Sequence, residues 1–456
     1  MAGFDLAGGM ERAGSRRGRA RRSAAVLAVS AFLAACGSNA SVPTTTVPDT
    51  SAAASTASTA ATVEPRPPKT IHVPGDAATI QAAVDQTVPG DLVLIAAGTY
   101  NEAVTVHTPG VVVRGASRNG VILDGRDKDE NGITVAAAGV AVENLTLKRY
   151  IVNGLLFTKA YDSPNPADPI ILKGYRASYV TAYNNGLYGI YAFFADGGVI
   201  EHSYASGHPD SGIYVGQCKP CDAVVRDVTA ERNAIGYEGT NAGGNLFVIN
   251  SVWRNNRVGM TPNSQDQEKL TPQADVVIAG NIVEDNNDTS APSTAEGAQG
   301  FGIAIAGGTR NRIVRNLVRR NASVGIAVTD LNAYEPAGNE VSQNVLEGNG
   351  TDLAFFDSRG SVSLPSRSNC FSNNTFTISK PVDIETSMGC PGSDRNVDNT
   401  GAVAVQKPAP NVDYRKVAAP PAQPEMPNAA NAPAVPASPA PPAIDLAAVT
   451  LPKGPS

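Results

Sequence analysis

The sequence has few aromatic residues and no excess of positive charge, and the apolar run near its beginning is too short to span a membrane. Phe, Trp and Tyr make up 5% of the 456 residues, so the core must be built from aliphatic side chains. The formal net charge of −6 argues against nucleic acid as a partner. The apolar run at residues 23–35 is too short to span a bilayer as a helix.

The first 36 residues have the organisation of an export signal. Five arginines lie between residues 16 and 22, ahead of the apolar run. The run ends Leu33-Ala-Ala-Cys36, which resembles a bacterial lipobox. That resemblance implies cleavage before Cys36 and a lipid on its thiol, which would anchor the exported protein to the bacterial cell membrane, facing the cell wall or periplasm. The alternative is an ordinary secretory signal. Residues 37–68, rich in Ser, Thr, Ala and Pro, are expected to form a tether.

A glycine followed by an apolar residue recurs through the middle of the chain. The marker glycines are Gly189, Gly212, Gly236, Gly259, Gly302 and Gly325. Their spacings are 23, 24, 23, 43 and 23 residues, so one interval carries an insertion. A fixed period of this length indicates a solenoid.

The runs between the glycines predict strands. Alternating apolar residues, such as Ile213 with Val215 and Ile303 with Ile305, suit short strands that share one apolar interior when coils stack. The residue four positions before each glycine is expected to form a corner where asparagine amides bond from coil to coil. Those positions hold Asn185, His208, Arg232, Asn255, Ala298 and Asn321. A β-sandwich is the alternative, but sandwiches do not keep a fixed period.

At this point residues 69–380 resemble the right-handed parallel β-helix, or pectin-lyase-like, superfamily, which includes β-helix repeat lipoproteins. The resemblance implies an all-β fold, a single-stranded right-handed parallel β-helix of about 23 residues per coil over residues 69–400. The segment TIQAAVDQTVPGDLVLIAAGTYNEAV resembles the capping segment of such proteins, and Asp76 is expected to cap a short helix at 77–86. The superfamily includes lyases, hydrolases, esterases, epimerases, adhesins and binders, so the fold alone does not set the function.

The period also predicts a binding face. The second residue after a marker glycine should point outward, which would place Tyr191, Tyr214 and Glu238 side by side, about 4.8 Å apart. Exposed aromatic rings stack on sugar rings, and carboxylates and amides hold sugar hydroxyls. The candidate substrate-binding residues are Tyr188, Tyr191, Tyr214, Asn241 and Arg254. The partner predicted for this face is an extracellular or cell-wall polysaccharide; the alternative is that the tyrosines only shield the flank.

Catalysis on this face would use His208, Asp210 and Glu238. A lyase or epimerase needs a base and a cation for a uronate, whereas a hydrolase needs two carboxyl groups, which Asp210 and Glu238 could supply. The motifs of polygalacturonases, mannuronan epimerases and pectinesterases are absent from the sequence. His208 also occupies a corner position, where a structural role competes. The sequence therefore predicts polysaccharide binding and leaves the choice between enzyme and binder open.

The cysteines other than Cys36 are predicted to form disulfides. In an exported protein the simplest of the three pairings joins Cys218 to Cys221 and Cys370 to Cys390. A metal site at Cys218 and Cys221 is the alternative, kept open by a resemblance to the β-helix proteins that load copper into nitrous oxide reductase. No cofactor is required by the sequence, although calcium or copper fits these alternatives.

Irregular segments interrupt and follow the solenoid. Insertions at residues 160–170, 261–274 and 287–299 are expected to be functional loops, because long loops in a compact domain usually are. Five arginines between residues 310 and 320 form either a solvated flank or a contact for an anionic polymer. Residues 401–456 are rich in Pro and Ala and are predicted to be a disordered tail.

Overall fold

The structure is a computed structural model that describes residues 66–266, 268–293, 297–359, 363–399 and 403–454. The predicted signal sequence, the predicted lipid attachment at Cys36 and nearly all of the predicted tether lie outside these ranges. No helix within them combines the length and apolar character needed to cross a membrane.

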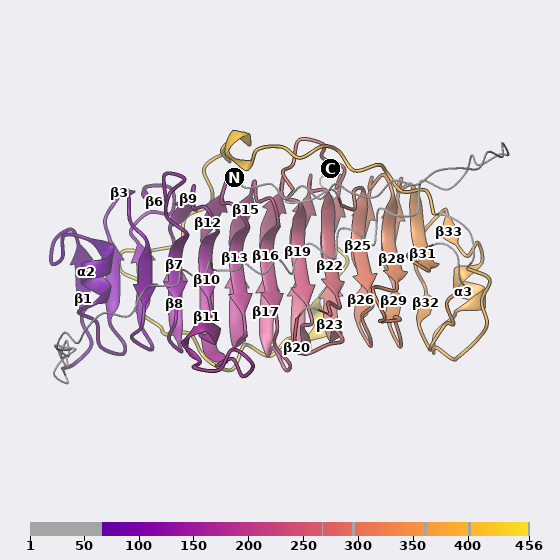
Figure 1. Cartoon of the computed structure of the whole chain (residues 1–456), viewed down its shortest axis with the longest axis horizontal. Helices are drawn as coiled ribbons and strands as arrows, with labels where there is room; N and C mark the ends of the chain where they lie inside the picture. The colour runs from indigo at the N-terminus through magenta and orange to yellow at the C-terminus, as the bar shows by residue number, and fades with distance from the viewer. Residues whose placement is uncertain (1–65, 267, 294–296, 360–362, 400–402, 455–456) are drawn as a thin grey trace, which may run out of the picture.

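Each coil contributes strands to three parallel sheets, here named A, B and C, and the coils stack into an elongated body (Figure 1). Sheet A contains, in spatial order, β1 (Thr70–Val73), β2 (Leu92–Ile95), β5 (Val112–Gly115), β8 (Val140–Glu143), β11 (Leu172–Ser178), β14 (Ala195–Glu201), β17 (Ala223–Arg226), β20 (Gly243–Ile249), β23 (Ala274–Ala279), β26 (Arg312–Val314), β29 (Glu340–Ser342) and β32 (Cys370–Ser372). Sheet B contains β3 (Gly98–Tyr100), β6 (Val121–Asp124), β9 (Thr146–Lys148), β12 (Thr181–Tyr183), β15 (Tyr204–Ser206), β18 (Thr229–Glu231), β21 (Val252–Arg254), β24 (Ile282–Glu284), β27 (Leu317–Arg319) and β30 (Val345–Glu347). Sheet C contains β4 (Val104–Val106), β7 (Asn131–Val135), β10 (Asn153–Phe157), β13 (Tyr188–Phe193), β16 (Ser211–Gly216), β19 (Ile235–Thr240), β22 (Val258–Asn263), β25 (Phe301–Ala306), β28 (Val324–Thr329), β31 (Thr351–Phe356) and β33 (Ser379–Lys380). This order is the predicted all-β parallel β-helix.

Side chains along each strand of sheet C alternate between the interior and the outside, so each coil adds one equivalent side chain to an interior row. The residue after each marker glycine points inward and pairs in register with its equivalent in the next coil. This interior row contains Ile190, Ile213, Tyr237, Met260, Ile303 and Ile326, all fully buried. The core is mainly aliphatic, as the low aromatic content predicts, although several aromatic side chains such as Tyr237 and Trp253 are also buried in it.

Asparagine side chains form a ladder at the corner between sheets B and C. Each side-chain amide donates to the side-chain oxygen of the next rung at 3.0 Å, through Asn233, Asn256, Asn286, Asn321 and Asn349. Because the rungs lie within the body, these bonds satisfy amides that have no access to water.

The predicted ladder positions Arg232, Asn255 and Ala298 are wrong. Arg232 and Asn255 have the left-handed backbone of the corner, with φ of 58° and 53°, and the rung is the residue that follows each of them. The left-handed residue turns the chain, so its own side chain faces outward while the next side chain enters the ladder. In the coil with the insertion, Asn286 takes the place predicted for Ala298.

Short helices cover the two ends of the stack. At the first coil α2 (Ile80–Val84) buries Ile80 and Val84, and its N-cap is Thr79 rather than the predicted Asp76. Asp76 instead accepts a bond from the backbone of His72 at 2.8 Å. At the last coil lies α3 (Ile384–Ser387). The remaining helical turns are η2 (Ala160–Asp162), η3 (Tyr414–Lys416) and η4 (Leu446–Ala448).

The tail predicted to be disordered instead packs along the β-helix. Figure 1 shows this segment running back from the last coils over the stack toward β9 and β12. Three arginines that are at most 1% exposed donate to proline carbonyls of the tail: Arg257 to Pro410 at 2.8 Å, Arg118 to Pro424 at 2.9 Å and Arg114 to Pro433 at 2.9 Å. Further on, Val449 packs with Ile249 and Val314 in a small apolar cluster. Proline carbonyls remain acceptors although the residue has no N–H, so a Pro/Ala-rich chain can be fixed by donors on the body.

Candidate functional site

The predicted outer row exists on sheet C. Tyr191 pairs in register with Tyr214, and Tyr214 pairs with Glu238 in the following coil. The fixed period therefore placed these three residues side by side. We call Tyr191, Tyr214 and Glu238 the strip.

Two of the three strip residues are covered, contrary to the expectation of an open face, whereas Tyr191 is half-buried. Tyr214 is 1% exposed and Glu238 is not exposed at all. The insertion after β22 folds over them, and Glu268 from this insertion accepts bonds from Gln217 and, at 3.5 Å, from the Tyr214 hydroxyl. The sequence showed the insertion but not the direction in which it folds.

Aromatic rings connect the covered strip with the surface. Tyr188 stacks on Tyr191 with ring centroids 4.2 Å apart, and Tyr191 lies 5.4 Å from Phe193. Phe193 in turn stacks at 6.4 Å on Tyr161, which is 74% exposed. Because Tyr161 belongs to the insertion at 160–170, this series of rings leads from solvent to the covered strip.

Two carboxyl groups meet beside the strip at the start of β16. The hydroxyl of Ser211 lies 2.6 Å from Glu238 Oε2 and 3.1 Å from Asp210 Oδ1. A hydroxyl donates only one hydrogen, so one of the two contacts needs a proton from the carboxyl side. Burial, and then the charge of Glu238, raise the pKa of Asp210 well above its usual range. The shared hydroxyl and the raised pKa of Asp210 both favour a proton on Asp210 in this pair.

Neutral donors hold Glu238 in place. Its Oε1 accepts from the Thr240 hydroxyl at 3.1 Å and from the Asn263 amide at 3.2 Å. Asp210 is also hydrogen-bonded to Tyr188. Both carboxyl groups are thus fixed by groups that carry no charge.

Glu268 is a third carboxyl group that sequence reasoning missed. Burial, and then the charge of Glu238, raise the pKa of Glu268 to about 8. Asn241 anchors the loop that carries it, because its side-chain amide and oxygen bond to the backbone oxygen and nitrogen of Gln265 at 2.9 and 3.0 Å. Asn241 is fully buried, so it positions the loop instead of contacting substrate as predicted. We call Asp210, Glu238 and Glu268 the carboxyl cluster.

The arginines predicted near the site are paired elsewhere. Arg254 lies on β21 of sheet B, where its guanidinium donates to Glu231 at 2.7 Å, so it does not join the strip. Four of the five arginines between residues 310 and 320 also form ion pairs: Arg310 with Asp275, Arg312 with Glu340, Arg319 with Glu284, and Arg320 with Asp285. The carboxylates in these pairs neutralise most of the positive charge of that patch.

His208 is a rung of the corner ladder and not a catalytic base. Its ring is fully buried, with Nδ1 2.8 Å from Asn233 Oδ1 and Nε2 3.2 Å from Asn185 Nδ2. Burial is the main cause that lowers the pKa of His208 to about 4. The ring is therefore neutral at pH 7 and occupied by two structural partners.

Replacing His208 with asparagine is expected to remove an acid-sensitive step in stability. An unfolded histidine titrates near pH 6.5, so between pH 6.5 and 4 the unfolded wild-type chain binds a proton that the folded chain does not. The wild type should lose about 2 kcal/mol relative to His208→Asn as the pH falls from 7 to 5. Urea unfolding at both pH values measures this change. A difference that stays constant with pH would contradict the assignment of His208 as a neutral rung.

Both cysteine pairs are disulfides in the structure. Cys218 and Cys221, at most 2% exposed, are joined at the connection between β16 and β17, with Cα atoms 4.6 Å apart. Within the described ranges no three His, Cys, Asp or Glu side chains gather in a way that could hold a metal ion.

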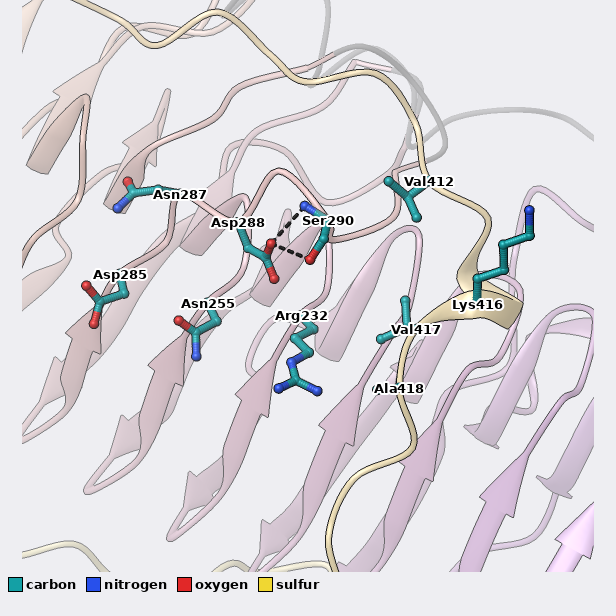
Figure 2. A pocket seen from close by; sticks show the side chains of 10 residues that line it. All are labelled: Arg232, Asn255, Asp285, Asn287, Asp288, Ser290, Val412, Lys416, Val417 and Ala418. Atoms are coloured by element: carbon teal, nitrogen blue, oxygen red, sulfur yellow. Dashed lines mark hydrogen bonds between the residues drawn. The ribbon is translucent and has the colours of Figure 1, made fainter.

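A cleft of about 630 Å³ lies on another side of the molecule, at the corner between sheets B and C (Figure 2). Its floor is made by the outward residues of successive corners, Arg232, Asn255 and Asp285. The insertion at 287–299 and the tail form its walls. The strip does not line it.

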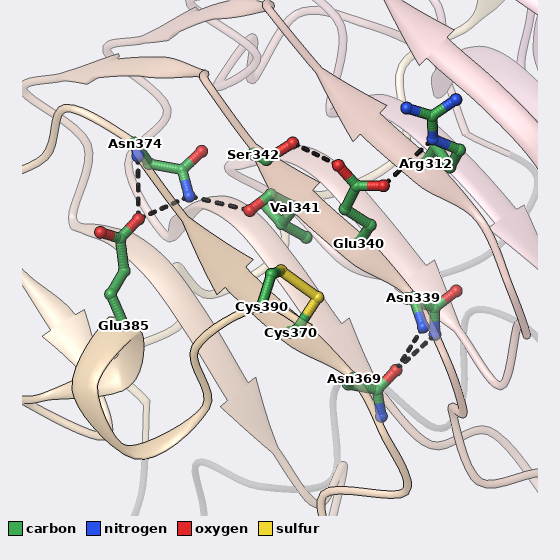
Figure 3. The surroundings of a disulfide bond; sticks show 10 residues. All are labelled: Arg312, Asn339, Glu340, Val341, Ser342, Asn369, Cys370, Asn374, Glu385 and Cys390. Carbon is green, nitrogen blue, oxygen red and sulfur yellow. Dashed lines mark hydrogen bonds and ion pairs between the residues drawn. A yellow bond between two sulfur atoms is a disulfide. The ribbon is translucent and has the colours of Figure 1, made fainter. Parts of the chain in front are cut away.

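The second disulfide closes the last coil. Cys370 of β32 is bonded to Cys390, which follows α3 (Figure 3). Beside it, Glu385 of α3 accepts from the backbone and side-chain nitrogens of Asn374, both at 2.8 Å. Asn374 is the last rung of a second ladder, at the corner between sheets A and B, in which Asn316 donates to Asn344 and Asn344 donates to Asn374. Glu385 takes the place that the next asparagine would have, so the cap ends this ladder without leaving an unpaired amide.

Comparisons with known proteins agree with the fold. Residues 173–346 match the family described as a right handed beta helix region. Similar solved structures include the A-module of a mannuronan C-5 epimerase from Azotobacter vinelandii, which is 14% identical, with a TM-score of 0.44 over 64% of this chain and 87% of that chain. A pectate lyase is 16% identical, with a TM-score of 0.45 over 71% and 81% of the two chains. An alginate lyase from Paenibacillus sp. is 14% identical, with a TM-score of 0.42 over 68% and 99%.

No curated protein sequence matches this chain. The TM-scores of the solved structures are below 0.5, so activity has to be argued from the residues of this protein. The matched segment and the three parallel sheets together show that the protein is a right-handed parallel β-helix.

Proposed function

We propose that this protein is an exported glycoside hydrolase that cleaves a neutral extracellular polysaccharide at the carboxyl cluster. The observation that carries the proposal is the buried Asp210–Glu238 pair, which shares the hydroxyl of Ser211 and in which the pKa of Asp210 is raised. A third carboxyl group, Glu268, has a pKa of about 8 and approaches from a loop. Hydrolysis of a glycoside needs a protonated and an ionised carboxyl group at the scissile bond, and the cluster contains both.

The carboxyl cluster would supply a general acid and a general base. Glu268, protonated at pH 7, gives its proton to the glycosidic oxygen as the bond from that oxygen to the anomeric carbon breaks. The ionised member of the Asp210–Glu238 pair removes a proton from water, whose oxygen bonds to the same carbon. Because Glu268 covers the strip in the structure, substrate enters when its contacts with Gln217 and Tyr214 open.

Charge favours a neutral polymer. The pKa values of Asp210 and Glu268 are shifted chiefly by burial, by other carboxylates and by neutral hydrogen-bond partners. A uronate would bring another negative charge to this cluster, and lyases and epimerases need a cation that faces it. The rings from Tyr161 to Tyr191 offer faces on which uncharged sugar rings can stack. Export and a lipid anchor at Cys36 are part of the proposal and rest on the sequence of the first 36 residues.

Replacing Glu268 with glutamine is expected to lower turnover of a cleaved polysaccharide about 100-fold, because the general acid is lost. Wild-type activity should fall as the pH rises through about 8, where Glu268 loses its proton, and the variant should lack this alkaline limb. Reducing ends released from a panel of neutral polysaccharides measure both effects. Glu347→Gln, which changes an exposed carboxylate on sheet B, is the matched control and should keep full activity.

Two results would count against hydrolysis. If no neutral polymer yields reducing ends, but one binds and Tyr191→Ala abolishes the binding, the protein is a carbohydrate-binding module. If only uronate polymers react, with unsaturated products, the cluster serves a lyase. The complete burial of Glu238 is the observation that favours a binder as the second candidate.

A further inference from the structure

The cleft at the corner between sheets B and C presents polar groups that the protein itself leaves unused. Arg232 and Lys416 form no ion pair with any residue in the described ranges, and the side-chain amide of Asn255 has no hydrogen bond there. Asp288 uses Oδ1 for the backbone and hydroxyl of Ser290, at 2.8 and 2.6 Å. Figure 2 shows Arg232 below Asp288 and Ser290, with Lys416 at the opposite edge on the tail.

The fold brings these groups together from three separate parts of the chain. Arg232 and Asn255 are outward corner residues with left-handed backbone, and their coils are stacked through the Arg232 N–H, which donates to the Asn255 carbonyl at 3.0 Å. Equivalent residues in stacked coils lie about 4.8 Å apart. Asp288 comes from an insertion and Lys416 from the tail. The cleft therefore exists only when the tail is packed on the β-helix.

The other residues that line the cleft include an apolar wall and a carboxylate that is already paired. Val412 and Val417 of the tail form a half-buried apolar wall. Asp285 is already paired with Arg320 at 2.6 Å, so it does not cancel the charge of Arg232. Two free cations and the one carboxylate of Asp288 leave the cleft with an excess of one positive charge.

We infer that this cleft binds a carboxylated sugar unit, and that the C-terminal tail completes the site. A ligand carboxylate would lie against Arg232, whose planar fork of donors matches it, while Lys416 adds positive charge at the opposite edge of the cleft. Sugar hydroxyls would bond to the Asn255 amide and to the free oxygen of Asp288, and the C–H face of the ring would contact Val412 and Val417. The chemistry differs from that of the carboxyl cluster, where negative charge is unfavourable, so the inference does not depend on the proposed hydrolysis.

The test is isothermal titration of the full chain with trigalacturonate, a carboxylated probe, and with galactotriose, a neutral probe of the same length. We expect trigalacturonate to bind at least tenfold more tightly than galactotriose, and more weakly as salt is raised. The double variant Arg232→Gln/Lys416→Gln should weaken trigalacturonate binding at least tenfold. Arg415→Gln, next to Lys416 but paired with Asp413 at 2.9 Å, should leave it unchanged, as should Glu268→Gln in the carboxyl cluster.

Three outcomes would overturn the inference. These are no heat with trigalacturonate, equal affinity for the neutral probe, and unchanged affinity in the double variant. Equal thermal unfolding of wild type and variants shows that a loss of binding is local. A loss of binding on Glu268→Gln with none in the double variant would place the acidic sugar at the carboxyl cluster and overturn this inference. The proposed hydrolysis is tested separately, by the reducing ends released from neutral polysaccharides.

Discussion

Replacing Gly302 with alanine is expected to lower the free energy of unfolding by about 3 kcal/mol or more. A Cβ on Gly302 would lie 2.5 Å from the carbonyl oxygen of Gly325 in the next coil and 2.8 Å from Cγ1 of Val318. The first contact is with backbone that is fixed in a ladder between β25 and β28, so it cannot move without breaking strand pairing. The marker glycines are therefore required by space and not by a positive φ.

Gly75→Ala is the control, since the nearest atom to its added Cβ is the His72 Cβ at 3.4 Å, an ordinary contact. Urea unfolding followed by circular dichroism should show a large loss for Gly302→Ala and little change for Gly75→Ala. Equal stability of the two variants would contradict the close approach of the coils at the marker glycines.

The coil stack was predictable because its cause is local and repeated. A glycine every 23 residues or so marks the place where one strand of sheet C meets the next, and the alternation around it sets which side chains face inward. The same logic placed Tyr191, Tyr214 and Glu238 in one row. At Asn255 the rung was placed one residue early because Asn255 and Asn256 are neighbours, and both a left-handed corner and a buried rung favour asparagine.

The candidate site depends on contacts between segments that no period relates. Glu268 covers part of the strip because its loop is anchored at Asn241. The sequence offered Asp210 and Glu238 as a possible pair of carboxyl groups, but their burial and the Ser211 hydroxyl that they share are seen only in the structure. Spacing sets the register of coils, whereas burial of a surface residue depends on where an insertion folds.

The tail was mispredicted for a related reason. Its composition gives no alternating apolar pattern, which is the usual signal of order, and proline removes backbone donors. What orders it is a set of arginine donors on the β-helix, and nothing near Arg114, Arg118 or Arg257 in the sequence marks them as ligands of a distant segment. A Pro/Ala-rich segment is disordered only when no surface of the same chain offers matching donors.

Replacing Arg114 with alanine is expected to lower the free energy of unfolding by about 3 kcal/mol and to loosen the tail. Arg114 is 1% exposed, and its guanidinium donates at 2.7 Å to Glu143, which is itself buried. The same guanidinium donates to the carbonyls of Ala432 and Pro433 at 2.6 and 2.9 Å. Removing it leaves a buried carboxylate with one cation fewer and three tail carbonyls, including that of Ala429, without this donor, which is costlier than losing an exposed pair.

Arg312→Ala is the matched control, because Arg312 also lies on sheet A but forms an exposed pair with Glu340, worth about 0.5 kcal/mol. Urea unfolding measures stability, and amide hydrogen exchange at Met426 and Ala437, whose N–H groups bond to the β-helix, reports the tail. Exchange at both amides should accelerate in Arg114→Ala only. If the β-helix is destabilised while these amides stay protected, Arg114 supports the coil stack alone. If they are released, the buried guanidinium of Arg114 both stabilises the coil stack and holds this part of the tail on the β-helix.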